Sequence, residues 1–170
     1  MTPTPSAPSA LDASSAPTGF DLSYLLNHTS HVLRTRMAAA LDEVGLTPRM
    51  HCVLEHALDE ERTQAQLAEI GDMDKTTMVV TVDALERAGL AERRPSTADR
   101  RARIIFVTDK GAELATRSRR IVDRVHAEAL GGVAEGDRAA FVRALEQLAQ
   151  GQLAEPVESP RPARRARQAA

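Results

Sequence analysis

The sequence has little from which to build disulfides, aromatic clusters or membrane spans. Its 170 residues include one cysteine, no tryptophan, one tyrosine and three phenylalanines. Because Cys52 is the only cysteine, an intramolecular disulfide is excluded, and a reducing cytoplasm is the expected compartment. No stretch of about 18 uncharged apolar residues is present, which excludes a membrane-spanning helix. The chain does not open on a basic region followed by an apolar run, so no secretory signal is expected.

The motifs of common enzyme classes are missing as well. The sequence has no glycine-rich phosphate loop, no nucleophile elbow and no HExxH pair. His51 and Cys52 are neighbours on a helix and therefore face apart, which makes His51 a poor base for that thiol. We expect a protein that is not an enzyme and that needs no cofactor or metal ion. The alternative is a hydrolase in which Cys52 meets a distant histidine, and its turnover would be sensitive to thiol reagents.

Charge is distributed unevenly along a chain whose net charge is −2. The last eleven residues carry Arg161, Arg164, Arg165 and Arg167 and no acid. Within residues 91–103, five arginines face only Glu92 and Asp99. A mildly acidic body with a local basic projection can bind nucleic acid through that projection.

The composition separates a folded domain from two tails. Residues 1–19 are rich in Pro, Ser, Ala and Thr and predict a disordered N-terminal tail. Residues 155–170 predict a disordered, Arg-rich tail, either a solubilising end or an accessory DNA-binding arm. The folded domain is therefore expected at residues 20–154.

Within that domain, hydrophobic periodicity predicts a mainly α fold with one small β-hairpin. Apolar residues recur at three- and four-residue steps, and glycines and capping residues punctuate them. The predicted helices are residues 21–44, a second opening at Pro48, 63–70, 74–88, 109–130 and 135–153. Two short strands, 90–94 and 104–107, flank a loop rich in turn formers and arginine.

The order short helix, tight turn, second helix and hairpin is typical of a winged helix-turn-helix. In such a unit the second helix enters the major groove of DNA, while the first crosses the backbone. The N-terminal end of helix 74–88 carries groups that can reach bases and phosphates. We therefore predict DNA contacts from Lys75, Thr76, Thr77 and Thr81.

Short pieces of sequence in a fixed order strengthen this interpretation. They are Leu46-Thr47-Pro48, Gln66-Leu67-Ala68, Asp74-Lys75-Thr76-Thr77, Leu85-Glu86-Arg87-Ala88-Gly89-Leu90, Arg93-Arg94, Asp99-Arg100-Arg101 and Thr108-Asp109-Lys110-Gly111. Single pieces are weak signals, but together the sequence resembles the MarR (multiple antibiotic resistance regulator) family over about residues 21–153.

The resemblance implies a homodimer with a DNA-binding part at about residues 48–108. Its helical dimerisation region would come from both chain ends, at about residues 21–44, 109–130 and 135–153. The resemblance also implies that Arg101 enters the minor groove, held by Asp99, with Arg94 and Arg100 nearby on the hairpin wing. One departure is Val79-Val80, where many members carry Thr-Arg.

The function implied is transcription regulation. We expect a repressor that binds a pseudo-palindromic operator in double-stranded DNA and is released by a small molecule, such as an aromatic ligand. One alternative is a winged-helix docking module that does not bind DNA. Another is a metal- or thiol-responsive sensor of the same fold.

The ligand pocket predicted by the resemblance lies between the dimerisation helices and the winged domain. Residues of the first two helices are its candidate lining: Tyr24, His28, His31, His51 and Cys52. The same residues could instead be core or dimer contacts. His28 and His31 lack a third ligand at diagnostic spacing, which argues against zinc. Cys52 is interpreted as a buried, inert thiol.

Overall fold

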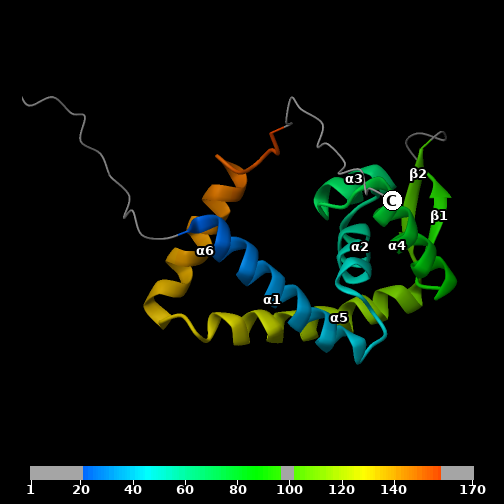
Figure 1. Cartoon of the computed structure of the whole chain (residues 1–170). Helices are drawn as coiled ribbons and strands as arrows, with labels where there is room; N and C mark the ends of the chain where they lie inside the picture. Colours follow the sequence, from blue (N-terminus) through cyan, green and yellow to red (C-terminus); the bar gives the residue numbers. More distant parts are fainter. Residues whose placement is uncertain (1–20, 97–101, 158–170) are drawn as a thin grey trace, which may run out of the picture.

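A computed structural model describes residues 21–96 and 102–157 (Figure 1). That part of the chain contains six helices and one two-stranded hairpin, which lies at one edge of the molecule. Their bounds are α1 (Leu22–Asp42), α2 (Pro48–Asp59), α3 (Gln64–Ile70), α4 (Lys75–Arg87), β1 (Ala91–Pro95), β2 (Arg103–Val107), α5 (Asp109–Leu130) and α6 (Glu135–Gln150). The predicted mainly α fold with a β-hairpin wing is confirmed. The N-terminal tail, and the C-terminal tail beyond residue 157, lie outside the described residues.

Side-chain caps explain why the helices begin where they do. Thr47, Thr63, Asp74 and Thr108 each accept a hydrogen bond from a backbone N–H in the first turn of the helix that follows. Such a bond satisfies a donor that has no partner within the helix. The last helix was predicted to reach residue 153, but α6 ends at Gln150, where Gly151 leaves helical geometry.

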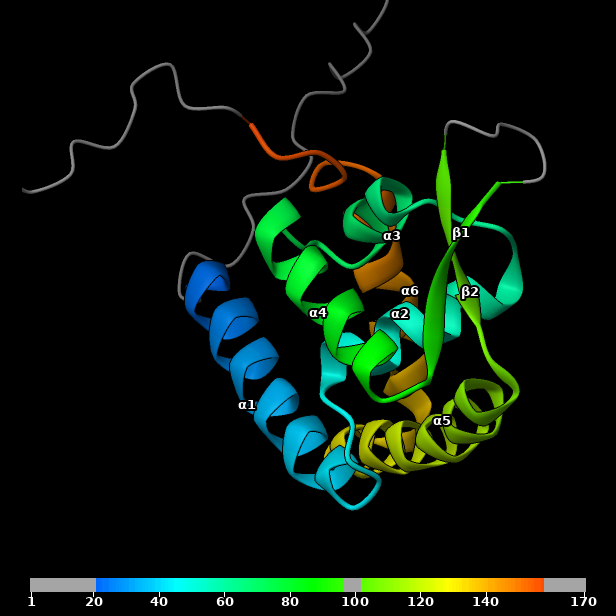
Figure 2. The ribbon, with the colours of Figure 1, turned by 90° about the vertical axis from the view of Figure 1, so that its right-hand side faces the viewer.

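The hydrophobic core joins the helix-turn-helix to α5. Leu54 of α2, Leu67 of α3, Met78 and Leu85 of α4, and Ile105 of β2 are almost completely inaccessible to solvent. Helix α5 crosses below this unit and packs against both α1 and α2 (Figures 1 and 2). The helix-turn-helix is therefore anchored to the long helices rather than tethered loosely to them.

The hairpin is antiparallel, with Ala91 paired to Val107 and Pro95 paired to Arg103. A third segment extends it, since Thr63 forms a bridge with Ile104 and the Ile105 N–H donates to the Arg62 carbonyl at 3.0 Å. The start of α3 is therefore fixed to β2 of the wing.

Helix α6 stands apart from this core. It rises from the far end of α5, away from the hairpin (Figure 1), and none of its residues is buried. Exposed apolar side chains lie along it and along the start of α1: Leu22, Tyr24, Leu25, Phe141, Val142 and Leu145. None of the helices in the described ranges is both long and apolar enough to cross a bilayer.

Candidate DNA-binding surface

The turn between α3 and α4 is tight because of two backbone positions. Gly71 ends α3, and its N–H donates to the Leu67 carbonyl at 3.1 Å. Asp72 has a φ of 47°, in the left-handed region that aspartate tolerates better than most residues. Together they redirect the chain within a few residues, so that α4 begins next to the end of α3.

Asp74 organises the N-terminal end of α4. One carboxylate oxygen accepts the Thr77 N–H at 2.9 Å, and the other accepts the Thr77 hydroxyl at 2.6 Å. These hydrogen bonds lower the pKa of Asp74 because they stabilise its ionised form. The Thr77 hydroxyl is thus committed to the cap, while the side chains of Lys75 and Thr76 are exposed.

Thr81, predicted to contact bases, points into the protein. It is only 6% exposed, and its hydroxyl donates to the Thr77 carbonyl at 2.8 Å. The spacing from Thr77 suggested a shared face, but the buried side of α4 extends to Thr81 and includes Met78 and Val82. We therefore leave Thr81 out of the DNA-binding surface.

The wing presents Arg94 on an aromatic support. Its guanidinium carbon lies 3.5 Å from the centre of the Phe106 ring, and its Nη2 lies 2.9 Å from a carboxylate oxygen of Glu92. Stacking on Phe106 limits the conformations of a long side chain that is otherwise exposed. Asp99, Arg100 and Arg101 lie outside the described residues, between Ser96 and Ala102 at the end of the hairpin.

Arg93 has a role that the sequence did not reveal. Its Nη2 lies 2.7 Å from Asp83, its Nη1 is paired with Glu86, and its Nε donates to Gln64 at 3.3 Å. The Arg93 N–H also donates to Glu86 at 2.9 Å. One half-buried side chain therefore connects β1 to α4 and α3. We call this set of four residues the Arg93 clamp.

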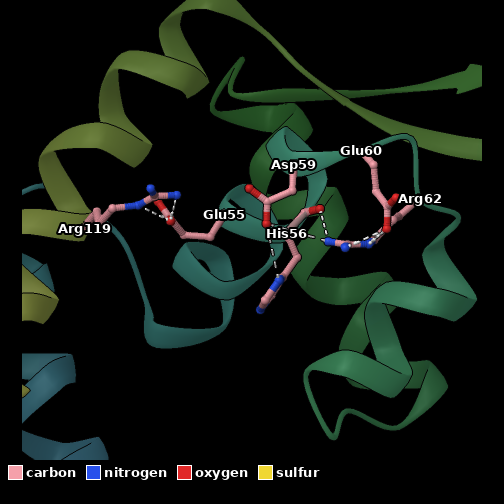
Figure 3. A network of polar contacts seen from close by, with 6 residues as sticks. All are labelled: Glu55, His56, Asp59, Glu60, Arg62 and Arg119. Atoms are coloured by element: carbon pink, nitrogen blue, oxygen red, sulfur yellow. Dashed lines mark hydrogen bonds and ion pairs between the residues drawn. The ribbon is translucent and has the colours of Figure 1, made fainter.

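A second polar network fixes the far end of α2 (Figure 3). Arg62 donates to the His56 carbonyl at 2.5 Å and pairs with Glu60 at 2.7 Å. On the other side, Arg119 of α5 donates to Glu55 of α2 at 2.5 Å, and this bond raises the pKa of Arg119. The pair of Arg119 and Glu55 ties α2 to the long helix α5 below it.

The five residues predicted to line one pocket are separated in the protomer. Tyr24 and His28 stack on the exposed side of α1, with ring centroids 5.4 Å apart. His51 is buried, and its Nδ1 lies 2.8 Å from the Ser118 hydroxyl of α5. Cys52 is half-buried near the α3–α4 turn, where burial raises the pKa of its thiol.

His31, one of these five residues, lines a cavity. The cavity, of about 550 Å³, is a groove between α1, the start of α2 and α4. Its lining residues are His31, Arg34, Thr35, Ala38, Thr47, Pro48, Arg49, Met50, Val80, Thr81 and Ala84. Arg34 and Arg49 are exposed and have no ion-pair partner within residues 21–96 and 102–157, so the groove carries uncompensated positive charge. In the same ranges, no three His, Cys, Asp or Glu side chains gather as metal ligands.

Comparison with known proteins gives a consistent result. The model of the MarR family matches residues 44–102, which span most of the helix-turn-helix and wing. The transcriptional repressor CouR bound to a 23-mer DNA duplex is 28% identical, with a TM-score of 0.67 over 75% of this chain and 92% of CouR.

Two ligand complexes are similar as well. CouR from Rhodococcus jostii RHA1 bound to p-coumaroyl-CoA is 26% identical, with a TM-score of 0.70 over 85% of this chain and 100% of that one. A MarR family protein of Mycobacterium tuberculosis in complex with p-aminosalicylic acid is 28% identical, with a TM-score of 0.65 over 76% of this chain and 99% of that one. The winged helix-turn-helix and the family match agree: residues 44–102 match the MarR family, and the chain is similar in fold to transcriptional regulators of that family.

Proposed function

We propose that this regulator is a homodimeric repressor that binds a pseudo-palindromic operator and is released by an anionic small molecule. The observation that carries the operator proposal is the exposed start of α4, the second helix of the helix-turn-helix, whose C-terminal half is paired with the hairpin. Lys75 and Thr76 are accessible there, next to a helix N-terminus that favours phosphate. CouR, with the same fold, is known in complex with a DNA duplex. DNA binding would place the protein in the cytoplasm.

The dimer proposal rests on the uncovered apolar side chains of α1 and α6. Phe141, Val142 and Leu145 repeat at helical spacing on α6, yet no part of the described protomer buries them. An amphipathic helix gains stability only when its apolar side is covered. A second copy of the chain would cover it and would place two α4 helices on one operator. Two-fold symmetry then predicts half-sites about 10 bp apart.

The ligand proposal rests on the charge and place of the groove. Arg34 and Arg49 bring two permanent cations to its wall, and His31 adds a third polar group. A carboxylate or phosphate pairs well with guanidinium groups. The opposite wall is α4 itself, so a ligand that prefers one position of α4 would change the fit to DNA. The CouR complex shows that a protein of this fold binds p-coumaroyl-CoA, which is an anion.

Selection of bound fragments from the sheared DNA of the source genome tests the operator directly. Purified full-length protein at physiological salt is expected to enrich a palindrome, and the flanking genes then indicate which metabolites to test. Lys75→Ala should reduce the slope of log affinity against log salt by about 1 if Lys75 meets a phosphate. If a folded dimer enriches no DNA sequence, the operator proposal is wrong and a docking role replaces it.

A further inference from the structure

Two valines interrupt the polar surface of the recognition helix α4. Val79 is 36% exposed and Val80 is 59% exposed, whereas Val82 of the same helix is fully buried. Thr76 and Val80 are one helical turn apart, so their side chains are neighbours on the exposed side. Val80 therefore lies on the part of α4 that a helix-turn-helix presents to the major groove.

The polar groups around the valines are already engaged. Asp83, one turn after Val79, is paired with Arg93 of the wing at 2.7 Å. Arg87 is exposed, and its Nε donates to the backbone carbonyl of Asp83 at 3.2 Å. The middle of the exposed side of α4 therefore offers methyl groups, with few free donors or acceptors beside them.

Only one base presents an apolar group at its edge in the major groove. Thymine carries the C5 methyl, while adenine, guanine and cytosine present only donors and acceptors there. A valine side chain cannot form hydrogen bonds with those polar groups. Its contact with a thymine methyl is favourable, because both apolar surfaces are removed from water. On the basis of the proposed operator binding, we propose that Val79 and Val80 read thymine methyl groups and so determine specificity within each half-site.

Val79 and Val80 differ in one useful respect. Val80 also lines the groove between α1 and α4, whereas Val79 does not. Val79→Ala therefore removes a proposed base contact without altering the groove wall, and Val80→Ala alters both. Alanine is a better helix former than valine, so neither change should disturb the helix.

The test replaces thymine with uracil at one position at a time in the selected operator. Uracil keeps every base-pairing group and lacks only the methyl. Wild-type protein is expected to bind at least one substituted position in each half-site about fourfold more weakly, the effect of losing one buried methyl contact. Val79→Ala or Val80→Ala should abolish that difference. Leu58→Ala, which removes a similarly exposed apolar side chain from α2, should leave it intact.

The outcomes separate this proposal from the one on which it rests. Equal affinity for the thymine and uracil operators at every position would overturn the valine assignment while leaving operator binding in place. The valine assignment would also be overturned if the double variant Val79→Ala, Val80→Ala lost as much affinity on uracil substitution as the wild type does. The wild-type comparison needs no variant to fold. If no DNA is selected at all, both proposals are wrong.

Discussion

His51 shows how one side chain can connect the two halves of the protomer. It lies on α2, is buried, and meets the Ser118 hydroxyl of α5 at 2.8 Å. Ser118 itself is completely buried and donates to the Ala115 carbonyl at 2.9 Å. With that hydroxyl proton in use, the bond from His51 needs a proton on Nδ1, which a neutral imidazole can supply.

The surroundings of His51 predict a pH effect on stability. Burial lowers the pKa of His51 below its usual 6.5, and the nearby carboxylate of Glu55 only partly opposes this. As pH falls below about 6.5, the unfolded chain takes up a proton that the native protein resists, so the free energy of unfolding decreases. A series of thermal melts from pH 7.5 to 5 should show this loss.

His51→Asn keeps a donor near the Nδ1 position but does not titrate, so it should flatten the loss. His28→Gln changes an exposed histidine of α1, far from His51 in the sequence, and should leave the pH dependence as in wild type. A wild-type slope in His51→Asn would show that other groups cause the loss.

A second prediction concerns Arg34 and Arg49. Because of their charge, we expect the groove to bind anionic ligands in preference to neutral ligands of the same shape. Aromatic carboxylic acids that raise the melting temperature should lose that effect when replaced by their primary amides, which have the same shape but no charge. The double variant Arg34→Gln, Arg49→Gln should bind neither form and should still fold, since both side chains are exposed. Equal stabilisation by acid and amide would contradict an anion site.

At the scale of elements, the position of the wing depends on the Arg93 clamp. Arg93 is only 27% exposed and satisfies Asp83 and Glu86 of α4 together. Removing it would leave two neighbouring carboxylates without their cation, so Arg93→Met should lower stability by about 1–3 kcal/mol. It should also weaken DNA binding, because the wing and α4 would no longer be held in one geometry.

The salt dependence of DNA binding distinguishes a clamp from a DNA contact. Arg93→Met is expected to leave the slope of log affinity against log salt unchanged, because the clamp contacts no phosphate. Arg101→Ala, by contrast, should give a shallower slope. A shallower slope for Arg93→Met would mean that Arg93 itself reaches the DNA.

The elements themselves could be predicted because their signals are local. Thr63, Asp74 and Thr108 each cap the helix that follows, and each stands in the sequence where a helix was expected to begin. The Arg93 clamp could not be predicted, since it joins residues up to 29 positions apart that only the folded hairpin brings together. Thr81 was misassigned for a similar reason, because the packing around α4 decides which of its sides is buried.

At the scale of the whole molecule, the proposed homodimer depends on α6, which has no buried residue in the protomer. Leu145→Asp places a charge among the exposed apolar side chains of α6, where a partner would bury it at high cost. The variant should sediment as a monomer and bind the palindrome far more weakly. It should still fold, because α6 contributes no buried residue to the protomer core.

Glu146→Ala, the neighbouring position, provides the control and should remain a dimer. A dimeric Leu145→Asp protein would place the interface elsewhere, for example on the stacked Tyr24 and His28 of α1.

The groove and the proposed base-reading side share a single helix of 13 residues. Val80 belongs to both, and Thr81 and Ala84 continue the groove wall from the same turns. After a gene duplication, a substitution at Val80 that retargets one copy to a new operator would at once reshape its ligand groove. A single substitution could therefore make two paralogues differ both in the genes that they control and in the metabolites that they sense.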